Sequence, residues 1–135
     1  MGALVGIVNY GCGNLFSVEN AIKKITSDYL VSSDKGELSK CDKLILPGVG
    51  SYKVAMDNII ELGLLDFLKE QCNSGKSILG ICLGMQLLLD KSYEGGETYG
   101  LGIVGGEVVE FTSTKEFRVP HIGWNDITYS NPSPD

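Results

Sequence analysis

The sequence has a single histidine, four prolines and no cluster of lysines or arginines. The shortage of basic residues limits the classes of partner that the protein could bind. Eleven basic residues against seventeen acidic ones give a formal net charge of −6, which argues against nucleic acid or an anionic membrane surface as a partner. No apolar stretch approaches the ~20 residues of a membrane span, and the N-terminus leads directly into a predicted strand rather than a secretory signal. We therefore expect a cytoplasmic protein.

The four cysteines also lack an informative pattern. Cys12, Cys41, Cys72 and Cys82 form no CxxC pair and no other spacing typical of metal ligands. Thiols of cytoplasmic proteins are normally reduced. The sequence therefore predicts free thiols, no metal site and no cofactor.

The composition is that of one globular domain. Over 135 residues, 43% are hydrophobic, which is enough for a buried core. The eighteen glycines cluster at the ends of apolar runs, where tight turns between strands and helices need them. We expect residues 1–135 to belong to a single domain.

Strand and helix patterns alternate along the chain. Short apolar runs predict strands over residues 3–8, 29–31, 42–46 and 77–81. Apolar residues at helical spacing predict helices over 15–25, 55–62 and 65–72, with a break at Gly63, whereas 33–37 is predicted to be a polar loop. Residues 107–111 alternate as an antiparallel strand does, and 130–135 have loop composition. This order predicts an α/β fold with a mainly parallel sheet flanked by helices and a small antiparallel patch.

Residues 80–86 form the most informative turn of this pattern. They link the fourth predicted strand to an apolar stretch, 83–89, that is predicted to be a buried helix. A Gly-x-Cys-x-Gly turn between a strand and a helix, with Cys82 at its apex, is typical of a nucleophile elbow. The thiolate is the reactive form of cysteine, and the N–H groups at a helix start favour it. The alternative is a small buried cysteine whose flanking glycines serve packing alone.

Two further loops stand at the ends of predicted strands. Residues 47–50, Pro-Gly-Val-Gly, cannot continue a strand ladder at Pro47, and their glycines leave backbone N–H groups exposed. Such donors beside a nucleophile are what an oxyanion hole requires. Residues 9–14 form a glycine-rich turn in which Asn14 is a predicted helix cap. Because that turn lacks GxGxxG and a P-loop lysine, we favour a turn that borders a site or a partner over a phosphate site.

Four motifs carry a resemblance to a known family. They are Tyr10-Gly-Cys-Gly-Asn14, Leu46-Pro-Gly-Val-Gly50, Gly80-Ile-Cys-Leu-Gly-Met-Gln86 and Pro120-His-Ile-Gly-Trp-Asn125. Together, from Leu4 to about Tyr129, they resemble class I glutamine amidotransferases, above all the glutaminase subunits of imidazole glycerol phosphate synthase. The resemblance implies a flavodoxin-like fold, and the α/β pattern itself predicts that the elbow lies at the carboxyl end of a central strand.

The resemblance also implies roles for individual residues. Cys82 would attack the side-chain amide of glutamine and form a glutamyl thioester and ammonia. The N–H groups of Val49 and Leu83 would hold the oxyanion. Residues that match glutamine-binding positions are Gly48, Gly50, Gln86 and Glu94. Residues that match the surface facing the cyclase barrel subunit, which receives the ammonia in a heterodimer of histidine biosynthesis, are Asn14, His121, Trp124 and Asn125.

One expected part of the family's site is absent. The family's catalytic base is a His followed two residues later by Glu, close to the C-terminus of a longer chain. The only histidine here, His121, lies in the Pro-His-x-Gly-Trp-Asn motif and is not assigned as the base. We therefore expect a domain truncated at its C-terminus and a 135-residue chain that is inactive by itself. The alternatives are an ammonia-donating subunit for another acceptor, such as a nucleotide-sugar amidotransferase, or a non-catalytic scaffold that retained the elbow.

Overall fold

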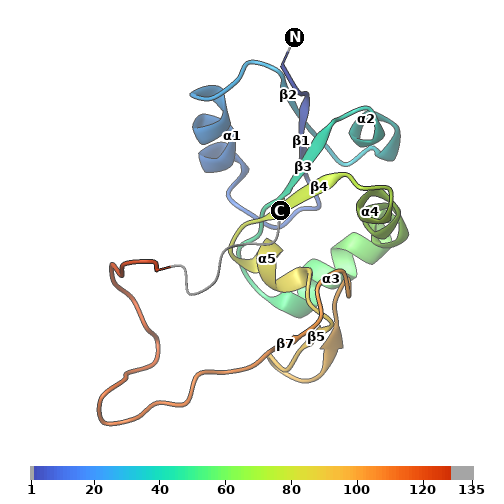
Figure 1. Ribbon diagram of the computed structural model, residues 1–135. Coiled ribbons are helices and arrows are strands. Elements are labelled where there is room, and N and C mark those ends of the chain that lie inside the picture. The colour runs from blue at the N-terminus through green and yellow to red at the C-terminus, as the bar shows by residue number, and fades with distance from the viewer. Residues whose placement is uncertain (1, 129–135) are drawn as a thin grey trace.

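The computed structural model describes residues 2–128 and shows a layered α/β arrangement (Figure 1). The strands β1 (Val5–Val8), β2 (Tyr29–Ser32), β3 (Lys43–Leu46) and β4 (Ser77–Gly80) form a parallel sheet in the order β2-β1-β3-β4. The helices are α1 (Leu15–Lys23), α2 (Lys35–Ser39), α3 (Tyr52–Glu61), α4 (Leu64–Asn73) and α5 (Leu83–Leu87). The helix α1 lies on one side of the sheet, and α2 and α4 lie on the other (Figure 1). The predicted α/β fold with a mainly parallel sheet is confirmed.

Parallel pairing brings three of the predicted loops to one edge of the sheet. In the register of the sheet, Leu46 at the end of β3 stands opposite Gly80 at the end of β4. Because parallel strands all end on the same side, the turn 9–14, the loop 47–50 and the elbow 81–82 follow neighbouring strand ends. This edge is where an α/β sheet normally places its site.

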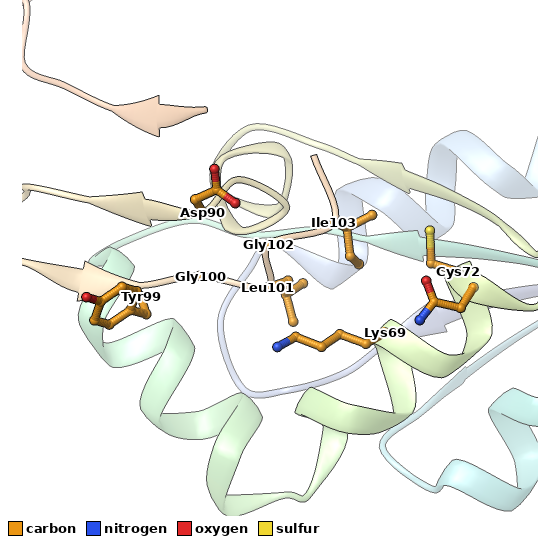
Figure 2. Close-up of a pocket in the computed structure, with 9 residues that line it drawn as sticks. Lys69, Cys72, Asp90, Tyr99, Gly100, Leu101, Gly102 and Ile103 are labelled. Atoms are coloured by element: carbon orange, nitrogen blue, oxygen red, sulfur yellow. The ribbon is translucent and has the colours of Figure 1, made fainter. Parts of the chain in front are cut away.

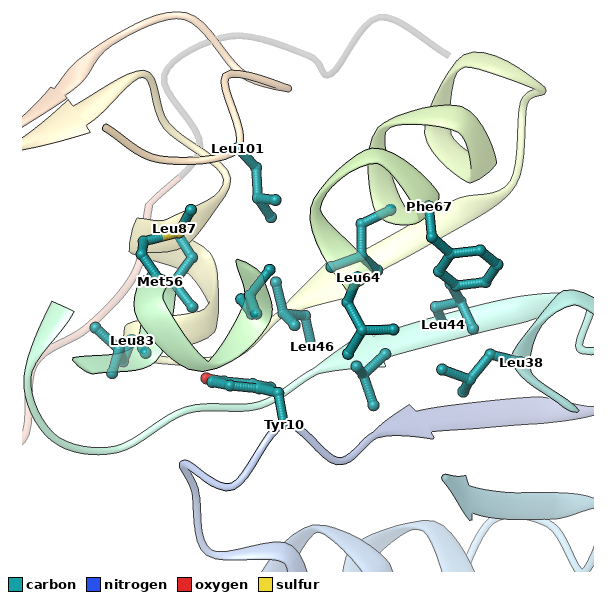
Figure 3. Packing of buried hydrophobic residues seen from close by; sticks show 14 of the residues in the cluster. Tyr10, Leu38, Leu44, Leu46, Met56, Leu64, Phe67, Leu83, Leu87 and Leu101 are labelled. Carbon is teal, nitrogen blue, oxygen red and sulfur yellow. The ribbon is translucent and has the colours of Figure 1, made fainter. Parts of the chain in front are cut away.

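The hydrophobic core lies between the sheet and the helices α2 to α5 (Figure 3). Fully burying one such apolar side chain stabilises a fold by about 1.5–3 kcal/mol. The largest fully buried side chains of the core include Tyr10, Leu38, Leu44, Leu46, Met56, Leu64, Leu68, Leu87 and Leu101. Leu83, the first residue of α5, belongs to this core, which fixes where the elbow stands.

Two predicted helix boundaries are confirmed, whereas one predicted loop is a helix. The predicted cap is confirmed, since Asn14 Oδ1 accepts a hydrogen bond from the Ser17 N–H at 3.2 Å. The break before α4 falls at Gly63, whose φ of 66° suits glycine. The predicted loop 33–37 is wrong, because residues from Lys35 onward form the short helix α2. Asp34 caps that helix, and five residues are too few to show a helical period.

A second, smaller sheet follows α5. It contains β5 (Lys91–Ser92), β6 (Thr98–Tyr99) and β7 (Glu107–Val108) in the order β6-β5-β7. The β5–β6 pair is antiparallel but the β5–β7 pair is parallel, so the expected antiparallel patch is a mixed sheet. The predicted strand 107–111 stops at Val108, after which the side chains are exposed. Alternation along a sequence indicates a strand but not the direction of its partner.

The elbow strand does not take the central position that the α/β pattern predicted. Among the described residues β4 is an edge strand, with β3 as its only neighbour in the sheet. Its Ile78 packs against the core, whereas Leu79 on the opposite face is 59% exposed. An apolar strand sequence predicts burial on both faces, but the tertiary structure described here covers only one.

The last described segment, residues 109–128, contains no helix or strand and extends away from the sheet (Figure 1). Its side chains are exposed throughout. The predicted loop 130–135 lies outside the described residues. In residues 2–128, no helix is long and apolar enough to cross a membrane.

Candidate active site

The predicted strand–turn–helix geometry around Cys82 is confirmed. The strand β4 ends at Gly80, and α5 begins at Leu83. Between them, Cys82 has φ 54° and ψ −117° and is the only described residue other than glycine with a positive φ. Such a conformation costs of order 1–3 kcal/mol and is found most often at functional sites. Its thiol is exposed to solvent.

The two glycines of the elbow are required by close packing. A Cβ on Gly80 would lie 2.6 Å from the Cα of Met85. A Cβ on Gly84 would overlap the carbonyl oxygen of Leu46 and lie 2.7 Å from its carbonyl carbon. The contacted atoms are backbone, which cannot turn aside as a side chain can. The glycines therefore let α5 start directly against the ends of β3 and β4.

The helix after the elbow is shorter than the predicted 83–89. Its end is set by a distant segment, because the carbonyl oxygen of Leu87 accepts from the Leu101 N–H at 2.8 Å. The next carbonyl, that of Leu88, accepts from the Ile103 N–H at 2.9 Å. Five residues make a weak dipole, and within residues 2–128 only Leu83 of the first turn has an N–H without a hydrogen-bond partner, so this N–H is the main contribution of the helix.

The loop 47–50 lies against the start of α5, as an oxyanion loop would. A Cβ on Gly48 would lie 2.8 Å from the nitrogen of Gly84 and 3.0 Å from the Cβ of Leu83. The N–H groups of Val49 and Leu83 make no hydrogen bond within residues 2–128. The loop that carries Val49 thus packs against the first turn of α5, directly after Cys82.

Tyr10, which the sequence analysis did not assign to the site, also contacts this loop. Its hydroxyl donates to the carbonyl oxygen of Pro47 at 2.5 Å. Burial raises the pKa of Tyr10, and the nearby thiols of Cys12 and Cys82 raise that pKa further. The phenol therefore stays protonated and remains a donor. The available signal was an aromatic hydroxyl at the start of a glycine turn, which needs a partner when buried.

Gln86 and Glu94 line a common pocket of about 750 Å³, and His121 lines it as well. Glu94 Oε2 accepts from the Tyr52 N–H, the first of α3, at 3.3 Å, so Glu94 stands next to the loop 47–50. Gln86 lies one helical turn after Cys82. Cys82 itself does not line the pocket. Two predicted glutamine-binding residues therefore meet beside the elbow and the loop.

The predicted partner-facing residues occupy two places. Asn14 caps α1, whereas His121, Trp124 and Asn125 lie on the extended segment 109–128. The His121 Nε2 and Asn125 Nδ2 atoms are 3.0 Å apart, and Trp124 is fully exposed. Exposed apolar side chains of this kind are typical of surfaces that bind another protein.

A separate pocket of about 490 Å³ lies between α4 and residues 99–103 (Figure 2). Lys69 and Cys72 from α4 line one side, and Asp90 lies near the other. Asp90 Oδ2 accepts from the Gly106 N–H at 2.9 Å, so this carboxylate has a structural partner. None of the predicted site residues lines this pocket.

Comparison with known proteins shows the family to which the chain belongs. The model of the SNO glutamine amidotransferase family matches residues 12–110. The imidazole glycerol phosphate synthase subunit HisH of Geobacillus kaustophilus (strain HTA426) is 48% identical over 135 residues, which is 97% of this chain and 64% of that protein. Subunit HisH 1 of Campylobacter jejuni (strain RM1221) is 48% identical over 125 residues, covering 92% of this chain and 62% of that protein.

A solved structure described as a glutamine amidotransferase superimposes with a TM-score of 0.68. It covers 78% of this chain and 56% of the other at 22% identity, which shows a common fold. The chain spans 64% of the length of the first HisH relatives that it matches.

Proposed function

Since this chain belongs to the SNO glutamine amidotransferase family, we propose that it is the glutaminase part of an imidazole glycerol phosphate synthase. It would release ammonia from glutamine for a cytoplasmic step of histidine biosynthesis. The observation that carries the proposal is Cys82 in a strained elbow conformation, with Leu83 directly after it and the loop of Val49 packed against the start of α5, neither N–H being hydrogen-bonded within residues 2–128.

The reaction follows from that arrangement. The Cys82 thiolate attacks the side-chain amide carbon of glutamine, and the carbonyl oxygen becomes an oxyanion held by the N–H groups of Val49 and Leu83. The C–N bond then breaks as the nitrogen takes up the proton that the Cys82 thiol gave up, and ammonia departs and leaves a glutamyl thioester. Water hydrolyses the thioester to glutamate and restores the thiol.

The glutamine itself would occupy the pocket lined by Gln86 and Glu94. Glu94 is suited to the substrate's ammonium group, because a carboxylate accepts charge-assisted hydrogen bonds. Gln86 offers both a donor and an acceptor to the substrate's carboxylate or amide. Gly48 and Gly50 would let the backbone of the loop approach the substrate, because neither carries a side chain.

The proposed partner is the cyclase barrel subunit, bound as a heterodimer. The segment 109–128 supports this, because its exposed apolar side chains include Ile122, Trp124 and Ile127. Asn14 and the neighbouring turn would contribute a second part of the contact. A partner that covers these residues would receive ammonia without releasing it to solvent.

The proposal is tested by labelling with 6-diazo-5-oxo-L-norleucine, a glutamine analogue with an electrophilic side chain, followed by peptide mass spectrometry. We expect the label on Cys82, and none after Cys82→Ala. Cys72→Ala is the matched control, because it removes another partly accessible thiol at a distance from the elbow. Preferential labelling of Cys12 or Cys72 in the wild-type chain would refute the assignment.

A further inference from the structure

Tyr10 links the end of β1 to the loop 47–50. The residue is 1% exposed, and its hydroxyl donates to the carbonyl oxygen of Pro47 at 2.5 Å. Within residues 2–128 this is the only hydrogen bond to that carbonyl. In Figure 3 the Tyr10 ring lies in the core with its hydroxyl end on the side of Leu83. The phenol therefore contacts the loop from the side of the hydrophobic core, near the start of α5.

Packing keeps the two segments in this relation. A Cβ on Gly48 would collide with the Tyr10 hydroxyl. A Cβ on Gly13, at the other end of the same turn, would contact the Cα of Gly48 at 3.5 Å. The turn 9–14 and the loop 47–50 thus meet at backbone distance, with Gly48 between the phenol and α5.

The hydrogen bond fixes the orientation of a peptide group. In a planar trans peptide the C=O and the N–H point in opposite directions. When Tyr10 holds the Pro47 carbonyl, the plane of the Pro47–Gly48 peptide is set. The next N–H, that of Val49, can then turn only about the torsions of Gly48. Glycine is the most permissive residue for such torsions, so they are limited by the packing of Gly48 between the Tyr10 hydroxyl and the start of α5 rather than by the residue itself.

We propose that Tyr10 is a positioning residue for the glutaminase reaction: its hydroxyl holds the Pro47 carbonyl so that the Val49 N–H stays aimed at the oxyanion formed at Cys82. This inference rests on the proposed function of the elbow. The inference gives a role in the reaction to a buried side chain in the turn after β1. The other groups of the reaction lie in the loops after β3 and β4.

The test separates carbonyl chemistry from simple thiol reactivity. A γ-thioester of glutamate acylates a thiolate through a tetrahedral oxyanion, and its thiolate leaving group departs without a proton donor. Iodoacetamide alkylates the same thiol by direct displacement, with no oxyanion. Both modifications of Cys82 are followed by mass spectrometry on the 135-residue chain. In Tyr10→Phe we expect saturated acylation at least ~10-fold slower, since loss of a whole oxyanion donor costs ~10²–10³.

In the same variant, half-saturation by the thioester and the rate of iodoacetamide alkylation should each change less than twofold. Tyr29→Phe is the matched control, because it removes a phenol that donates to Glu19 at 3.3 Å, away from the elbow. It should change neither reaction. A merely structural role of Tyr10 would slow both reactions alike or neither, and either result would overturn the proposal.

Alkylation of the buried thiol of Cys41 reports any unfolding of the variant. If Tyr10→Phe unfolds at the assay temperature, both reactions are compared with those of wild type at a lower temperature at which Cys41 stays protected. The same selective loss of acylation is expected, and equal acylation would refute the inference. A wild-type chain that alkylates at Cys82 but never acylates would instead refute the proposed function.

Discussion

Gly84→Ala tests whether α5 is held against the end of β3 as tightly as the structure shows. The added Cβ would overlap the carbonyl oxygen of Leu46 and lie 2.7 Å from its carbonyl carbon and 3.0 Å from that of Pro47. Ordinary carbon contacts are ~3.5–4.0 Å. The start of α5 or the loop 47–50 must therefore move by about 1 Å.

Two effects of this substitution oppose each other. Alanine is favoured over glycine inside a helix by about 1 kcal/mol, whereas overpacking against fixed atoms costs about 1–3 kcal/mol. Because the obstructing atoms are backbone, we take the upper end, which leaves a net loss of about 2 kcal/mol. With an unfolding entropy of about 2.1 cal/mol/K per residue near 60 °C, a chain of 135 residues would lose about 7 °C in Tm.

Thermal unfolding followed by circular dichroism measures this loss. Gly105→Ala is the matched control, because a Cβ there would meet nothing within 4 Å, and its Tm should change by less than about 2 °C, within the ~0.5 kcal/mol usual for surface sites. If Gly84→Ala were as stable as wild type or more stable, helix propensity would have prevailed. The close approach of α5 to β3 would then be wrong.

Two other outcomes are expected. Gly50 has φ 112°, which proline cannot adopt, so Gly50→Pro should slow acylation of Cys82 by a glutamate γ-thioester ~10²-fold, the cost of losing one oxyanion donor. A rate within threefold of wild type would show that the loop does not hold the oxyanion. The 135-residue chain by itself should release no measurable ammonia from glutamine, because no histidine or carboxylate of residues 2–128 hydrogen-bonds to Cys82 and general acid–base help is worth ~10²–10⁴. A steady rate of ammonia release that His121→Ala abolishes would contradict this expectation.

The family and the class of fold could be predicted from the sequence because their signals are local. The strands are recognised from short apolar runs. Asn14 marks the start of a helix because its side chain caps it, and Gly63 marks a helix break because glycine accepts a positive φ. The same holds for the elbow, whose Gly-x-Cys-x-Gly pattern encodes a turn that only small residues permit. The predicted amidotransferase family is the one whose model matches the chain.

Features that depend on distant contacts could not be predicted in this way. The helix α5 ends at Leu87 because the segment 101–104 binds its last carbonyl groups, and the alternation after Glu107 does not show that β7 runs parallel to β5. The edge position of β4 likewise depends on which segments cover its second face. The apolar sequence of that strand gives no information about its neighbours.

The candidate site divides in the same manner. The sequence predicts Cys82 from its Gly-x-Cys-x-Gly turn, and the family resemblance predicts the roles of Val49 and Leu83. The hydrogen bond from Tyr10 to Pro47 exists only because the ends of β1 and β3 meet at one edge of the sheet. The pocket shared by Gln86 and Glu94 exists only because α5 lies beside the second sheet and the segment that follows it. Glycines act on the torsions of their immediate neighbours, whereas a hydrogen bond between residues 37 positions apart exists only after the parallel register of β1 and β3 has formed.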